Sequence, residues 1–277
     1  MIRIITDTST MWTVEEGKKL NIDVVPLSVT INGETYREYE EINADTFNEI
    51  ISQGHVPISS QPPIGEFIDL FEKYADDEIL VISMADGLSG TYQSCMGAKE
   101  TVGRDNIVVL NSKTLALPHR YLVMDAIAMR DAGASLDEIV TKTKASIETS
   151  RSFLLPQDFQ YLSRGGRLTP LAARLSGLFK IQPVLTQTKD GTRLEKFAVG
   201  RNFNLAVNKL ISSLKEDGFN ENYRFGISHA FVPEQAKNVA KKLKAAFNVT
   251  EVEIENLSCA FITQGGPLCL AIQAISK

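Results

Sequence analysis

The stretch ILVISMADGLSGTYQSCM, residues 79–96, decides the fold class of this chain of 277 residues. Residues 79–82 form a short continuous apolar run, which is typical of a β-strand covered on both faces. The turn Ser89-Gly90-Thr91 follows the strand and opens a helix. A strand that leads through a turn into a helix is the repeating unit of a parallel sheet, so this stretch predicts an α/β fold.

The same alternation of strand and helix extends through the first half of the chain. Strands are predicted at residues 3–6 and 107–110. Helices are predicted to begin near residues 62–63, at Pro118 and after the capping residue Ser135. The first half is therefore expected to form a parallel sheet with helices on both faces.

Three signals in this half are local. Residues 24–31 are rich in β-forming side chains, but Pro26 restricts them to an edge strand or an irregular strand. The Asn-Gly pair at residues 32–33 predicts a hairpin turn. The run Asp-Thr-Ser at residues 7–9 is expected to cap a helix that extends through residues 15–20.

The second half has a different order of elements. A strand at residues 151–155 is followed by a helix at 157–162 and a hairpin at 181–199, and then by helices and strands at 203–214, 225–229, 233–247, 249–254 and 268–275. Because the length also favours two domains, we predict an N-terminal α/β domain at residues 1–154 and a C-terminal α+β domain at residues 155–277, with a mixed or antiparallel sheet.

Composition excludes several classes of protein. Hydrophobic residues make up 43% and charged residues 23%, which is typical of a folded globular chain. No apolar window is long enough to span a membrane, and the first residues lack the pattern of a secretory signal, so we expect a cytoplasmic location. The net charge of −5 argues against a nucleic-acid partner. Three cysteines without a CxxC spacing favour buried thiols over a metal site.

The charge is unevenly distributed along the chain. Residues 160–201 carry eight basic and two acidic side chains, a net of 8 − 2 = +6, so the remainder carries −5 − 6 = −11. Such a segment can attract an anionic ligand or an acidic partner surface, or it can be a solvated face. Its basic residues are Arg164, Arg167, Arg174, Lys180, Lys189, Arg193, Lys196 and Arg201.

Motifs for catalysis are scarce. The sequence holds no phosphate-binding loop, dinucleotide fingerprint or HExxH zinc motif, and its three histidines are far apart in sequence. The segment GLSGT, residues 87–91, departs from the GxSxG nucleophile elbow at Thr91. A serine esterase or acyl-transfer enzyme with Ser89 as nucleophile is therefore the alternative function rather than the first.

Hydroxyl side chains instead collect where strands lead into helices. Ser59 and Ser60 precede one helix, and Ser89 and Thr91 begin another, with Gly90 between them. At the carboxyl end of a parallel sheet, helix N-termini and neutral hydroxyls can hold an anion without reacting with it, and glycine lets the anion approach the backbone. Plain helix capping explains any one of these positions better than ligand binding does, although the segment around Ser89 has more glycine than a cap needs. A module that binds a phosphorylated metabolite is a third possibility.

Five motifs occur in a fixed order along nearly the whole chain. They are VPL at 25–27, SSQP at 59–62, LSGTYQS at 88–94, YLSRGGR at 161–167 and IQPVL at 181–185. Together they closely resemble the DegV family of bacterial fatty-acid-binding proteins, and LSGTYQS and YLxxGGR are the most specific of them. The resemblance implies a two-domain α/β protein that holds one fatty acid in a tunnel between the domains.

The resemblance also assigns residues. It implies that Ser59 and Ser89, with the adjoining Gly90 and Thr91, bind the fatty-acid carboxylate. Ser60, Arg167, Arg201 and Gln264 would lie at the head-group end or face a partner. Gln264 stands where the family has a histidine, so it can donate a hydrogen bond but carries no positive charge. Asp86 stands where a small polar residue is common, and we expect its carboxylate to point away from the bound anion.

Members of this family serve as the acyl-carrying subunit of a bacterial fatty acid kinase. The resemblance implies a separate kinase subunit that uses ATP to phosphorylate the bound carboxylate, which gives an acyl phosphate for phospholipid synthesis. The chain would make transient contact with the membrane acyltransferase. No catalytic residues, metal or cofactor are expected in the chain itself, only a long-chain fatty acid as ligand.

Overall fold

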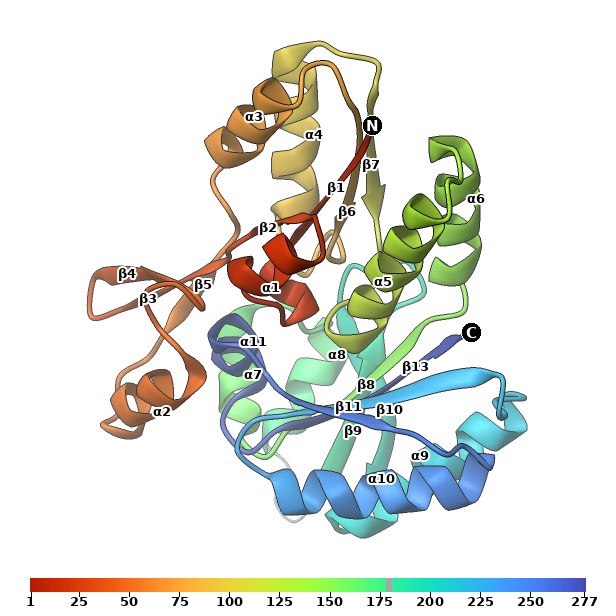
Figure 1. Ribbon diagram of the computed structural model, residues 1–277. Coiled ribbons are helices and arrows are strands. Elements are labelled where there is room, and N and C mark those ends of the chain that lie inside the picture. Colours follow the sequence, from red (N-terminus) through yellow and green to blue (C-terminus); the bar gives the residue numbers. More distant parts are fainter. Residues whose placement is uncertain (178–180) are drawn as a thin grey trace. The chain divides into compact units, whose positions relative to one another are not determined.

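The computed structural model describes residues 1–177 and 181–277, so Lys180 of the basic segment lies outside the described residues (Figure 1). The chain divides into two compact units. The first comprises Met1–Glu148 with Ser258–Ala260, and the second comprises Thr149–Leu257 with Phe261–Lys277. The predicted boundary at residues 154–155 falls inside strand β8, Arg151–Leu155, which pairs with strands of the second unit. The N-terminal part of the first unit therefore ends at Glu148, before this strand.

The first unit is built on a parallel sheet in the order β2-β1-β6-β7. Its strands are β1 Ile2–Asp7, β2 Asp23–Val25, β6 Glu78–Ser83 and β7 Ile107–Asn111. Helices α3 Ile64–Lys73 and α4 Thr91–Val102 cover one face, and α5 Leu117–Asp131 and α6 Leu136–Ile147 cover the other. This confirms the predicted parallel sheet with helices on both faces.

Alternate residues of the central strands explain why both faces need a helical layer. Ile82 of β6 packs with Val123 of α5, whereas Val81 packs with Phe67 of α3 and Cys95 of α4. Since successive side chains of a strand point to opposite faces, a continuous apolar run must be buried from both sides.

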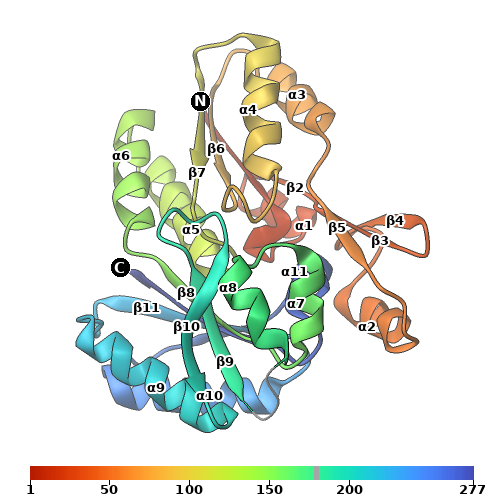
Figure 2. The same ribbon diagram turned by 180° about the vertical axis from the view of Figure 1, so that it is seen from behind.

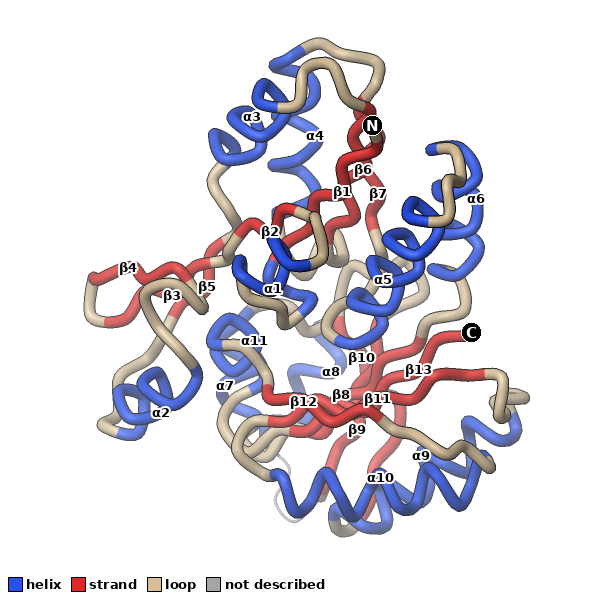
Figure 3. Tube along the Cα trace, viewed as in Figure 1, coloured by secondary structure: helices blue, strands red, loops and turns tan. Residues whose placement is uncertain are grey.

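A smaller antiparallel sheet in the same unit was not predicted as a separate element. It has the order β4-β3-β5, with β3 Ser28–Ile31, β4 Glu34–Arg37 and β5 Ile58–Ser60, and Figure 3 shows it beside α2 Ala44–Ser52. Asn32 and Gly33 both have positive φ, 55° and 83°, which confirms the hairpin turn.

The expected cap of the first helix was wrong. Thr13 caps α1, Val14–Lys19, while the hydroxyls of Thr8 and Ser9 are buried in the interior.

The second unit contains a six-stranded mixed sheet in the order β10-β9-β8-β13-β11-β12. Of the described strand pairs in this six-stranded sheet, only β11 with β12 is parallel, as expected for an α+β domain. The remaining strands are β9 Gln182–Gln187, β10 Leu194–Gly200, β11 Tyr223–His229, β12 Glu253–Asn256 and β13 Leu270–Ser276.

Helices cover this sheet unequally. Helices α9 Phe203–Glu216 and α10 Pro233–Phe247 lie along one face, where they bury the larger apolar cluster (Figure 2). The other face carries a smaller cluster with α7 Phe159–Gly165 and α8 Pro170–Ala173, which leads into the short η2 Arg174–Gly177.

Helix α11, Cys259–Gly265, was not predicted. No helix within the described ranges has the length and apolar character that crossing a membrane requires.

Candidate functional site

The turn before α4 presents the hydroxyls that the sequence singles out. Gly90 is the N-cap residue of α4 and offers no side-chain cap, so the Oγ of Ser89 accepts a weak bond from the Thr91 N–H at 3.4 Å. The two hydroxyls of Ser89 and Thr91 lie 2.9 Å apart. Thr91 is buried and Ser89 is half-buried. The turn therefore holds paired neutral donors at the positive end of a helix.

The Ser59-Ser60 segment of β5 lies beside this turn, and Gln61 makes the connection. Ser59 is half-buried and pairs with Val29 of β3, whereas Ser60 is exposed. The Nε2 of Gln61 donates to the Oγ of Ser94 in α4 at 2.9 Å. Its Oε1 lies 1.9 Å from where a Cβ on Gly90 would stand. The fold thus places the two hydroxyl-bearing motifs side by side.

The acidic side chain in this turn is already engaged. The carboxylate of Asp86 accepts hydrogen bonds from the Gly87 N–H at 3.1 Å and from the Nε2 of Gln93 at 2.9 Å. Gln93 is exposed on α4. Two donors therefore fix the orientation of the Asp86 carboxylate, and that it points away from a bound anion stays a prediction.

In the second unit, two glycine-rich turns lie against each other. The Oε1 of Gln264 lies 2.0 Å from where a Cβ on Gly165 would stand, so Gly165 leaves room for the amide. The guanidinium of Arg167 donates to the Gly165 carbonyl oxygen. Arg201 is exposed in the turn between β10 and α9. The structure thus places Arg167 and Gln264 at one turn and Arg201 at another.

Sequence reasoning missed a buried polar network in the first unit. Ser9, Asp7 and His119 are each at most 1% exposed. The Oγ of Ser9 lies 2.7 Å from Nδ1 of His119, whose Nε2 lies 2.9 Å from the carbonyl oxygen of Ile82. Burial lowers the pKa of His119, although the charge of Asp7 opposes this effect. His119 is therefore a hydrogen-bonded core histidine, and its serine neighbour is Ser9 rather than the predicted nucleophile Ser89.

Glu38 is the second buried group that carries no sequence signal. It is fully buried, accepts a short hydrogen bond from the Thr8 hydroxyl, and accepts another from the Ala260 N–H at 3.0 Å. Burial raises its pKa to about 7, while the bonds from Thr8 and Ala260 act in the opposite direction. Because Glu38 stands near Glu40 and Glu41, the sequence shows only an ordinary acidic run.

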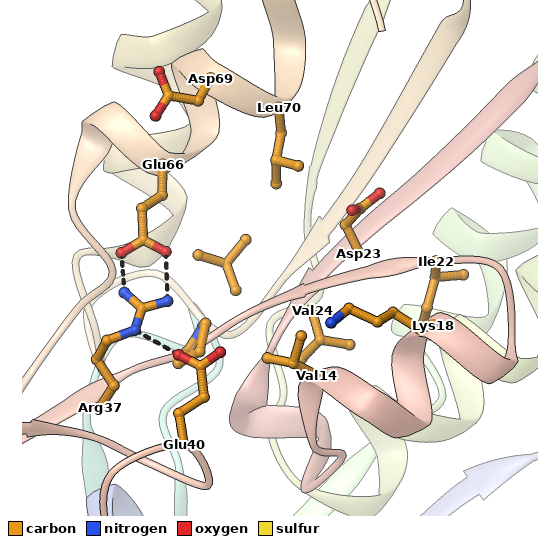
Figure 4. Close-up of a pocket in the computed structure, with 12 residues that line it drawn as sticks. Val14, Lys18, Ile22, Asp23, Val24, Arg37, Glu40, Glu66, Asp69 and Leu70 are labelled. Carbon is orange, nitrogen blue, oxygen red and sulfur yellow. Dashed lines mark hydrogen bonds and ion pairs between the residues drawn. The ribbon is translucent and has the colours of Figure 1, made fainter. Parts of the chain in front are cut away.

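A cavity of about 260 Å³ in the first unit is lined in part by Val25 and Pro26 of the VPL motif (Figure 4). Arg37 is one of its lining residues and forms ion pairs with Glu66 and Glu40. Its lining includes neither Ser59 nor Ser89. Within the described ranges, no group of three or more histidine, cysteine or acidic side chains could hold a metal ion.

Comparison with known proteins places these motifs in a family. A model described as "Uncharacterised protein, DegV family" matches residues 1–277. A DegV domain-containing protein of Staphylococcus aureus strain N315 is 32% identical over 277 residues, which cover 99% of this chain and 98% of the relative.

Solved structures agree with this assignment. "DegV, a fatty acid binding protein from Bacillus subtilis" is 28% identical, with a TM-score of 0.86 and coverage of 100% of this chain and 99% of that one. A fatty acid binding DegV family protein from Streptococcus agalactiae is 25% identical, with a TM-score of 0.91 and the same coverage. From its motifs, its fold and these matches, the chain belongs to the DegV family.

Proposed function

We propose that this protein binds a long-chain fatty acid, holds its carboxylate with the hydroxyls of Ser59 and Ser89, and presents it to a separate kinase. The observation that carries the proposal is the contact of Gln61 with Gly90 and Ser94, which joins the two hydroxyl-bearing segments. The Bacillus and Streptococcus relatives, both named as fatty acid binding, support the choice of ligand.

The chemistry of the ligand suits neutral donors and an apolar channel. Each buried methylene is worth about 0.8 kcal/mol, so a sixteen-carbon tail supplies on the order of 10 kcal/mol before ordering costs. A hydrogen bond to the carboxylate adds about 1.5–3 kcal/mol. In this proposal the tail provides most of the affinity, and the hydroxyls fix which end of the ligand is presented. The proposal includes the apolar tunnel for the tail that the family resemblance implies.

The proposal gives the chain no catalytic step of its own. The hydroxyls of Ser89 and Thr91 can donate to a carboxylate, but neither is an acid or a base near neutral pH. A kinase that uses ATP would form the acyl phosphate, and a membrane acyltransferase would consume it for phospholipid synthesis. Arg167, Arg201 and Gln264 of the second unit are proposed to serve the head-group end or the partner.

A titration with palmitate tests the proposal. The wild-type chain, stripped of lipid, should bind palmitate, and Ser89→Ala should lower the affinity about tenfold because one charge-assisted hydrogen bond is lost. Phosphotransfer by the kinase should fall further than binding, since the tail still holds the ligand. Ser212→Ala, at an exposed position of α9, is the matched control and should bind like the wild type. Failure of the wild type to bind palmitate would refute the proposal.

A further inference from the structure

We propose that Gln61 is a positioning residue, which clamps the Ser59-Ser60 segment onto the first turn of α4 and so sets the spacing of the two head-group hydroxyls. This assignment rests on the proposed function. It also gives Gly90 a different task from the one expected from sequence: glycine is needed there to admit the Gln61 amide, not the ligand.

The space beside Gly90 is occupied by the amide of Gln61. A Cβ on Gly90 would lie 1.9 Å from Oε1, 2.6 Å from Cδ and 2.9 Å from Nε2 of Gln61. The backbone of Gly90 has φ −76° and ψ 6°, which other residues adopt without strain. Backbone conformation therefore does not require glycine at this position, whereas the contact with Gln61 does.

The other end of the same amide is anchored in α4. Nε2 of Gln61 donates to Oγ of Ser94 at 2.9 Å, and Ser94 is 7% exposed. The N–H of Ser94 in turn donates to the Gly90 carbonyl oxygen at 2.9 Å. Gln61 thus contacts the first turn of α4 at two points, Gly90 and Ser94, which lie next to each other along the helix.

The segment after Gln61 makes a second close contact with α4, further along the helix. A Cβ on Gly97 of α4 would lie 3.0 Å from Cδ1 of Ile64, the first residue of α3. The segment that starts at Gln61 therefore remains packed on α4 for two turns. Its anchoring at Gly90 is part of this packing and does not depend on one hydrogen bond alone.

The contact of Gln61 with Gly90 lies close enough to Ser59 and Ser89 to restrict the distance between their hydroxyls. Ser59 is two residues before Gln61, a length of chain that spans at most about 7 Å, and Ser89 is the neighbour of Gly90. When Gln61 is fixed against Gly90, the range of positions open to Ser59 relative to Ser89 is small. Loss of the clamp should therefore weaken recognition of the carboxylate while the apolar tail is still bound.

A comparison of two ligands distinguishes a loss of head-group positioning from a general loss of folding. Palmitate carries the carboxylate, and hexadecanol has the same chain length without a charge. Gln61→Ala should lower the affinity of the full chain for palmitate about tenfold and change that for hexadecanol by less than about twofold. Ser94→Ala, which removes only the hydrogen bond, should give a smaller loss in the same direction. An unfolding temperature close to the wild-type value would show that the variants are folded.

A double-mutant cycle of Gly90 and Gln61 tests whether Gly90 makes room for the Gln61 amide or for the ligand. Gly90→Ala should lower the palmitate affinity in the wild-type chain but cost little more in the Gln61→Ala chain, because the clashing amide is then absent. If Gly90 instead admits the ligand, Gly90→Ala will cost the same in both, and the inference is overturned. Gly65→Ala in α3, where a Cβ meets open space, is the matched control.

Failure of the proposed function and failure of the Gln61 inference would give different results. A wild-type chain that binds no palmitate contradicts the proposed function. A wild-type chain that binds palmitate, together with Gln61→Ala and Gly90→Ala chains that bind it equally well, contradicts the clamp alone.

Discussion

The buried carboxylate of Glu38 accepts a hydrogen bond from the backbone N–H of Ala260, a residue 222 positions later in the chain. Through this bond, Ser258–Ala260 is held in the first unit although the residues on either side belong to the second. The same carboxylate receives the Thr8 hydroxyl, and the charge of Asp7 adds to the effect of burial on its pKa. One titratable carboxylate therefore accepts hydrogen bonds from Thr8 and from Ala260 in the first turn of α11.

The first prediction concerns pH. Because the pKa of Glu38 is raised from 4.5 to about 7 on folding, the folded chain binds more protons than the unfolded chain between these values. The stabilisation from this group is complete below pH 4.5 and is lost as the pH rises through 7. Glu38→Gln should remove this part of the pH dependence and be more stable than the wild type at pH 8, by up to about 3 kcal/mol.

Urea unfolding at pH 5 and pH 8 measures the effect. The difference in unfolding free energy between the two pH values should shrink in Glu38→Gln and stay as in the wild type in Glu49→Gln, an exposed position of α2. An equal pH dependence in wild type and Glu38→Gln would show that the carboxyl does not titrate in this range.

The contact between Gly165 and Gln264 gives a second prediction, for the second unit. A methyl group at residue 165 would lie 2.0 Å from the Gln264 Oε1, so Gly165→Ala should displace this amide and destabilise the unit by about 1 kcal/mol, the low end of the cost of overpacking, because the clash is with the end of a flexible side chain. In a Gln264→Ala background the penalty should largely disappear. Chemical denaturation of the four chains checks this, and a full penalty in the double variant would mean that the clash is with another group.

A third prediction addresses the basic segment. Arg174 is exposed in η2. If the proposed kinase partner docks through the basic segment, Arg174→Glu should weaken that complex and reduce the salt dependence of its affinity, because a long-range attraction is reversed. Lys215→Glu is the matched control, since α9 covers the opposite face of the sheet. Unchanged affinity and unchanged salt dependence in Arg174→Glu would count against docking through this segment.

The esterase alternative yields a fourth prediction. The Ser89 hydroxyl contacts Thr91, which cannot act as a base, and the buried His119 is paired with Ser9. A fluorophosphonate probe should therefore leave Ser89 unlabelled, and the chain should not hydrolyse a nitrophenyl acyl ester. Hydrolysis that disappears in Ser89→Ala would instead establish a nucleophilic serine.

The sequence predicts best those features that short segments determine. The apolar run at residues 79–82 requires cover on both faces, and the main sheet has it. The Asn32-Gly33 turn and the capping box of Ser135 with Glu138 also depend on neighbouring residues, and both are present. Local rules of this kind act over a few residues and need no knowledge of the fold.

Features that depend on distant partners could not be predicted in the same way. Strand β5 has three residues and exists because it pairs with β3, about thirty positions earlier. The contact of Gln61 with Gly90 decides whether the two hydroxyl segments meet, yet each segment alone has the pattern of a helix cap. The burial of Glu38 depends on Thr8 and Ala260, which lie far away along the chain.

The most direct test of the central claim is to identify the ligand that the protein carries. A native mass spectrum of the intact chain purified from a bacterial host, followed by lipid extraction, should show one long-chain fatty acid per chain, and Ser59→Ala/Ser89→Ala protein should retain less of it. A chain that carries no lipid and also takes up no added palmitate would contradict the account.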